Sequence, residues 1–173
     1  LDFWAIWCGP CIKSFPHLEE LQSKFPNDLQ IITITDDPEE RIKRFLDNRK
    51  MNLPIVIDEK NELAQIFPHG VIPHTVVIDK SGIIRAITTP SEITEELIKR
   101  ILLDQELNIE EKKDVINFDP SLPLSGNENF TYQITITPYK DGYPTFSNPN
   151  GGEAPYTGRR ILATNLSARA LFE

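Results

Sequence analysis

The chain has 173 residues, 39% of them hydrophobic and 25% charged, which suits one domain of ordinary size plus a smaller piece. A net charge of -8, from 18 Lys and Arg against 26 Asp and Glu, disfavours electrostatic binding to nucleic acid or to an anionic membrane. No apolar run approaches the roughly 18 residues of a membrane span, and no charged n-region followed by an apolar stretch begins the given sequence. Because it starts at Leu1 directly in a strand-like run, we expect a fragment of a longer protein.

The first hundred residues carry alternating strand and helix patterns. Residues 1–6 form an apolar run typical of a buried strand, and 11–25 repeat apolar side chains on one helical face. Asp37 and Pro38 offer an N-cap and a first-turn proline for a second helix, and Ser91 offers a cap for the last one. In chain order we expect a strand at 1–6, a helix at 11–25, a strand at 29–35, a helix from 38, a strand at 53–57, a helix at 61–67, a hairpin of 75–78 with 83–88, and a helix after 91.

The composition changes after Leu103, which predicts a domain boundary there. Residues 1–103 form the expected α/β domain, 104–119 an acidic linker, and 120–173 a partial second domain or an extension. Residues 120–158 hold six Pro and five Gly, a density that favours loops. We expect a strand at 130–138 and a strand over 160–172 that turns into a helix at Asn165.

The chain has two cysteines, and both belong to the run Trp7-Cys8-Gly9-Pro10-Cys11, where a strand pattern ends and a helix pattern begins. A cysteine just ahead of a helix faces unpaired backbone N–H groups, which stabilise its thiolate and lower its pKa. Cys8 is therefore the candidate nucleophile, and Cys11, one turn further in, the candidate resolving thiol. Gly9 and Pro10 allow a tight turn that keeps the two sulfurs close enough for a disulfide.

Two other interpretations of the cysteine pair stay open. Half of a structural zinc site needs two more ligands, for which only His17, His69 and His74 are available. The cysteines could also be two buried, inert thiols, which is at odds with their position at a helix start. We expect neither a metal nor an organic cofactor.

Asp2 lies in an apolar run, where a charge is costly, so the pKa of its carboxyl is predicted to be raised. A residue at the end of a strand without a chemical role is the alternative. Trp4 and Trp7 are expected either to cover the site and support substrate contact or to be ordinary core aromatics. His17 and His69 are expected at the surface.

The strand and loop around the cysteines resemble the active site of thioredoxins, on the residues Asp2–Cys11 (DFWAIWCGPC), with Pro16 at the thioredoxin helix kink. The run Val71–Asp79 (VIPHTVVID) resembles the cis-proline strand of the same family. The extra segment 53–67 is similar to the TlpA/ResA-like oxidoreductases. The resemblance covers about residues 1–103 and implies a thioredoxin-like fold, with a central mixed sheet flanked by helices and a first strand that has lost its start.

The resemblance also implies roles for single residues. Asp2 matches the buried acid that accepts the proton of the resolving thiol, whereas the lysine that partners this acid in thioredoxins has no counterpart in 31–35. Pro73 would be cis against the cysteine pair, which frees the Ile72 backbone to pair with a substrate strand. His74 departs from the small or hydroxyl residue usual there and would either tune the Cys8 pKa or point to solvent. The implied substrate-binding residues are Trp7, Gly9, Pro10, Ile72, Pro73 and His74.

A thiol–disulfide oxidoreductase that reduces protein disulfides is the implied function. Its expected partners are protein disulfide or dithiol substrates and an upstream electron donor, and its expected location is extracytoplasmic. A docking module of the same fold without redox turnover is the alternative, and a peroxidase fits less well because this fold usually places the peroxide-reactive cysteine in another loop. Residues 130–173 weakly resemble the start of a bacterial domain of unknown function.

Overall fold

The computed structural model describes residues 1–116, 139–148 and 162–166. These residues belong to two compact units, Leu1–Lys112 and Lys113–Glu173. No helix among them is long and apolar enough to cross a membrane. The domain boundaries at 103 and 119 stay predictions.

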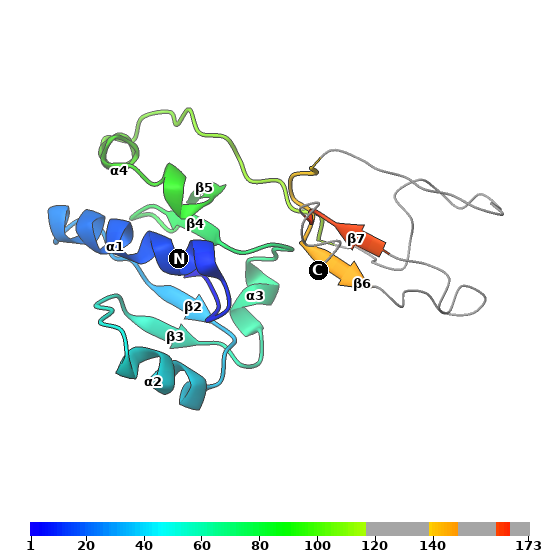
Figure 1. Cartoon of the computed structure of the whole chain (residues 1–173). Coiled ribbons are helices and arrows are strands. Elements are labelled where there is room, and N and C mark those ends of the chain that lie inside the picture. The colour runs from blue at the N-terminus through cyan, green and yellow to red at the C-terminus, as the bar shows by residue number, and fades with distance from the viewer. Residues whose placement is uncertain (117–138, 149–161, 167–173) are drawn as a thin grey trace, which may run out of the picture. The chain divides into compact units, whose positions relative to one another are not determined.

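The first unit is built on one mixed sheet with the strand order β3-β2-β1-β4-β5 (Figure 1). β1, β2 and β3 run parallel, β4 pairs antiparallel with β1, and β5 pairs antiparallel with β4. The α/β class and the hairpin between the last two strands are thereby confirmed. The strands are β1 (Asp2–Phe3), β2 (Thr33–Thr35), β3 (Ile55–Ile57), β4 (His74–Ile78) and β5 (Ile84–Thr88).

Each helix predicted in the first unit is present, with different bounds. They are α1 (Gly9–Lys24), α2 (Glu39–Asp47), α3 (Glu62–Ile66) and α4 (Glu95–Leu102), and the short 3₁₀ helix η1 (Pro90–Glu92) precedes α4. Two predicted caps are wrong. Pro38, not Asp37, is the N-cap of α2, because the Asp37 carboxylate bonds to other groups. Ser91 lies within η1, and Thr94 caps α4 by accepting the Leu97 N–H at 3.1 Å.

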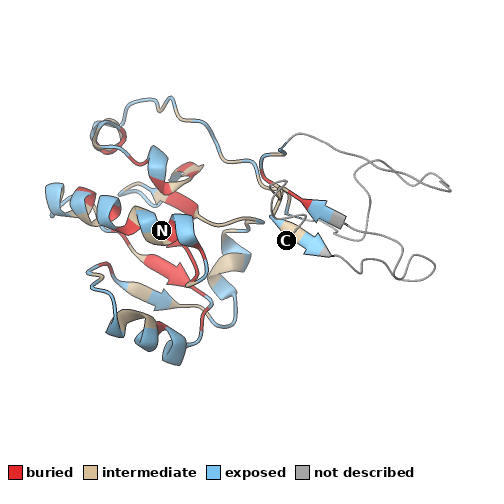
Figure 2. Cartoon of the chain, in the orientation of Figure 1, coloured by how far each residue is buried: buried red, intermediate tan, exposed pale blue. Residues whose placement is uncertain are grey.

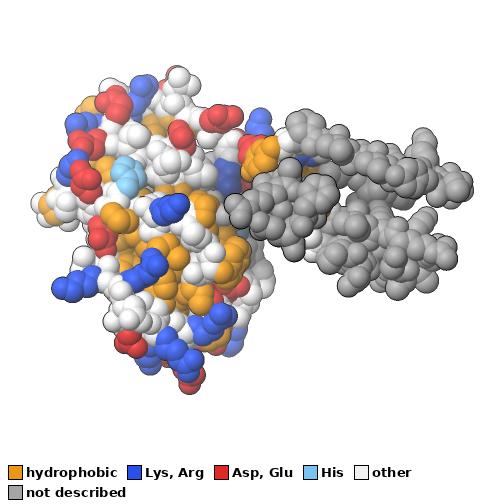
Figure 3. Space-filling view, in the orientation of Figure 1, with side chains coloured by type: hydrophobic (Ala, Val, Ile, Leu, Met, Phe, Trp, Pro, Cys, Tyr) orange, Lys and Arg blue, Asp and Glu red, His pale blue; other side chains and the backbone are white. Residues whose placement is uncertain are grey.

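The buried residues of this unit lie mainly in its strands and on its helices (Figure 2), and they form two hydrophobic clusters. Trp4 and both cysteines belong to the larger cluster, together with the apolar faces of α1 and α4. Phe3 and Val76 belong to a smaller cluster. Since neighbouring residues of a strand face opposite sides of a sheet, Trp4 and Phe3 mark its two faces. On the view in Figure 3, hydrophobic side chains of this unit form a patch beside Lys and Arg side chains.

Residues 104–112, the first part of the acidic linker predicted at 104–119, belong to the first unit. Leu107 and Ile109 contact its larger cluster, and Lys112 donates its backbone N–H to Ile87 of the edge strand β5 at 2.9 Å. Arg85 of the same strand pairs with Asp104 at 2.7 Å.

The second unit contains an antiparallel pair, β6 (Phe146–Asn148) and β7 (Leu162–Thr164). After β7, Asn165 takes a left-handed conformation with φ of 52°. Its side chain accepts the Lys140 N–H at 3.0 Å and donates to the Lys140 and Tyr143 carbonyls. The strand predicted at 130–138 lies outside the described residues. Of the helix predicted from Asn165, only Asn165 and Leu166 are described, and neither is helical.

Candidate active site

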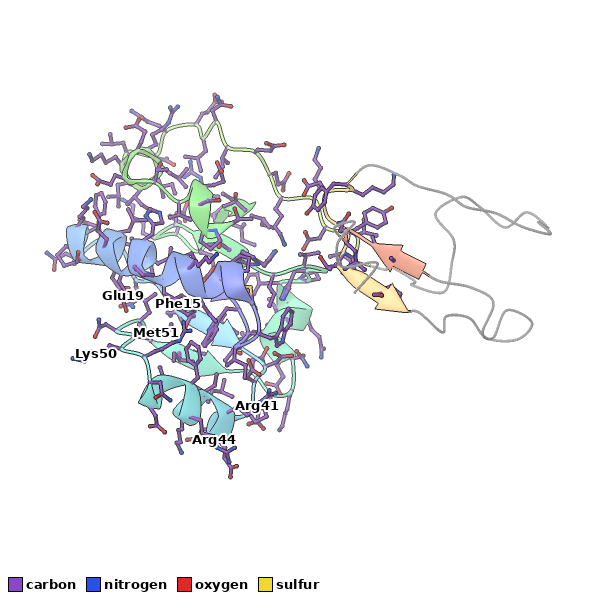
Figure 4. All side chains as sticks on the ribbon, viewed as in Figure 1. Phe15, Glu19, Arg41, Arg44, Lys50 and Met51 are labelled. Atoms are coloured by element: carbon purple, nitrogen blue, oxygen red, sulfur yellow. A yellow bond between two sulfur atoms is a disulfide. The ribbon has the colours of Figure 1, made fainter. Side chains whose placement is uncertain are left out.

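The two cysteines are joined in a disulfide at the N-terminal end of α1, drawn in yellow in Figure 4. Cys8 is the N-cap residue of this helix, and its Sγ accepts the Cys11 backbone N–H at 3.3 Å. On reduction, a Cys8 thiolate at this position meets the same N–H and the positive end of the helix dipole. Both features favour the charged form of the thiol.

The residues around the disulfide differ strongly in exposure. Both cysteines are buried, with 3% of Cys8 and none of Cys11 exposed, whereas Gly9 and Pro10 are exposed and Trp7 is 73% exposed. Pro10 lies in the first turn of α1, where its missing N–H costs no hydrogen bond. The disulfide is thus bordered by exposed apolar surface that a second polypeptide can contact.

The two tryptophans have different environments. Trp4 is a core residue whose ring packs edge-on against Phe15 at 5.0 Å and tilted against Phe45 at 5.4 Å. Trp7 lies at the surface, next to Cys8 in the sequence. Of the two interpretations offered by the sequence, Trp4 therefore fits the core and Trp7 fits the site.

Three hydrogen bonds hold the chain that leads from β1 to Cys8. The Trp4 N–H donates to Ile34 O at 2.9 Å, and the Cys8 N–H closes a turn by donating to Ala5 O at 2.9 Å. Within this turn, the Ile6 N–H donates to Oδ2 of Asp37 at 2.8 Å.

Sequence analysis missed Asp37 as part of the site and assigned it to a helix cap. The missed signal was its place two residues after the end of β2, a strand parallel to β1. The carboxyl ends of neighbouring parallel strands meet at one edge of the sheet, so Asp37 comes close to the loop that follows β1.

Asp2 is almost fully buried in β1, and burial raises the pKa of its carboxyl to about 6. A weaker effect lowers this pKa: a hydrogen bond of 2.8 Å from the Thr75 hydroxyl to Oδ1. Its Oδ2 has no hydrogen-bond partner among the described residues. The raised pKa predicted from the sequence is confirmed, and it allows the group to exchange a proton near neutral pH.

Ile72 and Pro73 lie directly before β4, the neighbour of β1 in the sheet. The peptide bond between them is cis, and both residues are half-buried. Ile72 packs against both hydrophobic clusters.

His74 lies on the sheet face opposite to Asp2. It pairs with Phe3 across β1 and β4, its ring lies 5.6 Å from the Phe3 ring, and it stacks on His69 at 4.6 Å. Its Nδ1 is 3.5 Å from Nζ of Lys112, and the residue is only 2% exposed. The imidazole therefore lies neither on the face that holds the cysteines nor in solvent, the two positions that the sequence left open.

The other two histidines also lie apart from the cysteines. His69 is half-buried rather than at the surface as expected, because its ring packs on Phe3 at 4.8 Å. His17 is exposed, and its Nε2 lies 2.8 Å from Ile93 O. Among the described residues, no group of three His, Cys, Asp or Glu side chains is placed to hold a metal ion.

The AhpC/TSA family model matches residues 1–87, about half of the chain. The chain belongs to the AhpC/TSA family. This match contains the cysteine pair, Asp2, Asp37 and Thr75, so the whole candidate site belongs to the AhpC/TSA region.

Two relatives of this chain have names that are consistent with this family. Over 104 residues the chain is 31% identical to thiol-disulfide oxidoreductase ResA of Geobacillus thermodenitrificans, with 59% of each chain covered. It is 29% identical over 110 residues to thioredoxin-like protein YneN of Bacillus subtilis, covering 60% of this chain and 63% of that one. The chain thus spans about three fifths of these relatives. The resemblance to the thioredoxin superfamily and its ResA-like members is confirmed.

A solved structure shows the same fold. The crystal structure of a proposed thiol:disulfide interchange protein DsbE from Chlorobium tepidum is 27% identical and superposes with a TM-score of 0.52. The likeness covers 59% of this chain and 75% of that one. The first unit of this AhpC/TSA-family chain is therefore thioredoxin-like, as the sequence predicted.

Proposed function

We propose that this protein is a thiol–disulfide oxidoreductase that reduces disulfides of other proteins, with Cys8 as nucleophile and Cys11 as resolving thiol. The observation that carries the proposal is the position of Cys8 as the cap of α1, with its Sγ on the Cys11 N–H. The names of the ResA and DsbE relatives support it.

The reaction proceeds in two exchange steps. The Cys8 thiolate attacks one sulfur of a substrate disulfide, which forms a mixed disulfide and releases the other substrate sulfur as a thiolate. Asp2 accepts the proton of the Cys11 thiol, and the Cys11 thiolate attacks Cys8 Sγ. This step releases the second substrate thiolate and leaves the Cys8–Cys11 disulfide. Substrate gains two electrons, and an external dithiol donor returns two electrons to the protein.

The substrate is an extended polypeptide that lies over the exposed residues beside the buried disulfide. Its backbone pairs with Ile72 beside Pro73, and its side chains contact Trp7, Gly9 and Pro10. The exposure of the last three residues supports this placement. His74 is not retained as a substrate contact, because its ring is buried on the other face of the sheet.

The proposed place of action is extracytoplasmic, where substrate disulfides persist. The TlpA/ResA-like segment supports this location. Cell fractionation of the full-length protein tests it: recovery from the cell envelope or periplasm supports the proposal, and recovery from the cytoplasm refutes it.

Trapping of mixed disulfides tests the proposed roles of the cysteines. A Cys11→Ser variant lacks the resolving thiol and is expected to accumulate covalent complexes with a disulfide-containing protein such as insulin, which dithiothreitol releases. Cys8→Ser, the matched control, is expected to trap none. Equal trapping by both variants, or peptide binding by the parent with no disulfide reduction, contradicts the proposal and favours a docking module.

A further inference from the structure

We infer that Asp37 is a positioning residue that fixes the turn carrying Cys8 and thereby sets the reactivity of the Cys8 thiolate. The inference concerns residues outside the cysteine motif. It rests on the proposed function only for its biological meaning, because its test measures the thiol itself.

Both carboxylate oxygens of Asp37 are engaged, although only 5% of the residue is exposed. Oδ2 accepts the Ile6 N–H at 2.8 Å and the Thr35 hydroxyl at 3.2 Å. Oδ1 lies 3.6 Å from Nη1 of Arg41, a residue labelled in Figure 4 on α2. The Asp37 N–H donates to the Thr35 hydroxyl at 3.2 Å, which fixes the backbone as well as the side chain.

The turn from Ala5 to Cys8 needs this partner. Within the described part of the chain, the backbone hydrogen bond that closes this turn runs from the Cys8 N–H to Ala5 O, and Ile6 lies inside the turn, outside any helix or strand. The Ile6 N–H is partly buried, so losing its acceptor leaves a donor poorly satisfied. A carboxylate also makes a stronger hydrogen bond to a backbone N–H than a neutral acceptor does.

The geometry of the turn from Ala5 to Cys8 determines where the Cys8 sulfur lies. Cys8 ends the turn and begins α1, and its Sγ contacts the Cys11 N–H at 3.3 Å only while the cap geometry holds. When the Ile6 bond is lost, we expect the turn to loosen and the Cys8 thiolate to spend less time on this donor. The pKa of the Cys8 thiol then rises, and the thiolate fraction near neutral pH falls.

The charge of Asp37 acts in the opposite direction, which allows the two effects to be separated. A carboxylate near a thiolate raises the thiol pKa by repulsion, although the Arg41 guanidinium offsets part of this charge. Asp37→Asn keeps an acceptor oxygen and removes the charge, whereas Asp37→Ala removes both. Positioning therefore predicts a raised Cys8 pKa in the Ala variant alone, and a purely electrostatic role predicts a lowered pKa in both variants.

The test is the pH dependence of Cys8 alkylation by iodoacetamide in reduced full-length protein that carries Cys11→Ser. Asp37→Ala is expected to raise the midpoint by about half a pH unit or more, which lowers the alkylation rate below the midpoint about threefold. Asp37→Asn is expected to return the midpoint to the parent value or below it. Asp36→Ala removes the adjacent, exposed carboxylate and serves as the matched control, with no change expected.

Two results overturn the inference: an unchanged midpoint in folded Asp37→Ala, or equal shifts in the Ala and Asn variants. If Asp37→Ala does not fold, amide hydrogen exchange of the parent decides. The Ile6 amide is expected to be protected about as well as the Trp4 amide, and exchange at the rate of an unstructured amide refutes the inference. If the Ala and Asn variants separate as expected while Cys11→Ser traps no substrate, the positioning role stands and the proposed function fails.

Discussion

The Thr75 hydroxyl donates a hydrogen bond of 2.8 Å to Oδ1 of Asp2 across the antiparallel pair β1 and β4. Both residues are buried on the sheet face that also holds Trp4. The hydrogen bond favours the charged carboxylate, but burial outweighs it, and the pKa of Asp2 is about 6. Asp2 therefore changes its protonation state in the pH range where thiols exchange.

The raised pKa of Asp2 predicts that the oxidised protein loses stability as the pH rises. Because the folded-state value of about 6 exceeds the ordinary 3.8, the folded protein retains a proton that the unfolded chain releases between these values. The stabilisation is fully present below pH 3.8 and is lost as the pH rises through 6. At about 1.4 kcal/mol for each pKa unit, the loss is about 3 kcal/mol.

Denaturant unfolding of Asp2→Asn and its parent between pH 3.5 and 7.5, followed by Trp4 fluorescence, measures this loss. The Asn side chain does not titrate, so the difference in unfolding free energy between the two proteins is expected to change by about 3 kcal/mol over this range. A difference that stays constant with pH contradicts the assignment.

Removal of the Thr75 hydroxyl is expected to raise the pKa of Asp2 further above 6, because the carboxylate loses the hydrogen bond that this hydroxyl donates. NMR titration of the Asp2 side-chain carboxyl carbon in Thr75→Val reports the shift. Thr88→Val is the control, since Thr88 is also buried and pairs with Thr75 on the far side of β4. Equal titration midpoints in the two variants would show that the hydrogen bond is unimportant.

The corrected cap of α4 gives a third prediction. Thr94→Ala removes the acceptor of the Leu97 N–H and is expected to destabilise the first unit by about 1 kcal/mol. Ser91→Ala, at the cap expected from the sequence, removes only an exposed contact with the Thr89 hydroxyl at 2.8 Å and is expected to change stability by less than about 0.5 kcal/mol. Denaturant midpoints compare the two, and a larger effect at Ser91 rules out the observed cap.

Replacement by alanine is expected to disturb the structure at Gly142 but not at Gly9. At Gly142, with φ of 78°, an added Cβ would lie 1.9 Å from Lys113 O. Gly142→Ala is therefore expected to speed hydrogen exchange of the Val115 amide, which donates to Gly142 O, by about tenfold or more. Unchanged Val115 exchange would contradict the described packing of the second unit.

At Gly9 an added Cβ has nothing within 4 Å, so Gly9→Ala is expected to leave the first unit folded and its stability within about 1 kcal/mol.

The cysteine motif and the elements around it were predictable because their signals are local. A strand pattern, a Cys-Gly-Pro-Cys turn and an amphipathic helix follow one another within 25 residues, and the raised pKa of Asp2 follows from its apolar neighbours. The role of Asp37 was not predictable from local patterns. Asp-Pro before a helix matches a cap, and only the parallel pairing of β1 with β2 turns the carboxylate toward Ile6 instead.

The position of His74 depended in the same way on strand register. Directly after Pro73, the residue could face either side of the sheet, and the sequence does not show which. The register that pairs Asp2 with Thr75 places His74 with Phe3 on the opposite face. His74 therefore follows Pro73 directly in the sequence motif, but it lies on the side of the sheet opposite to Asp2 and the cysteines.

The redox equilibrium of the Cys8–Cys11 pair tests the central claim most directly. The full-length protein is equilibrated in graded dithiol and disulfide buffers, and the oxidised fraction is measured by thiol alkylation and by fluorescence of the exposed Trp7. One reversible two-electron transition is expected, with a midpoint near the thioredoxin value of about −270 mV. A midpoint near the oxidant value of about −120 mV would contradict the reducing direction. The absence of any reversible transition would contradict the proposed exchange chemistry itself.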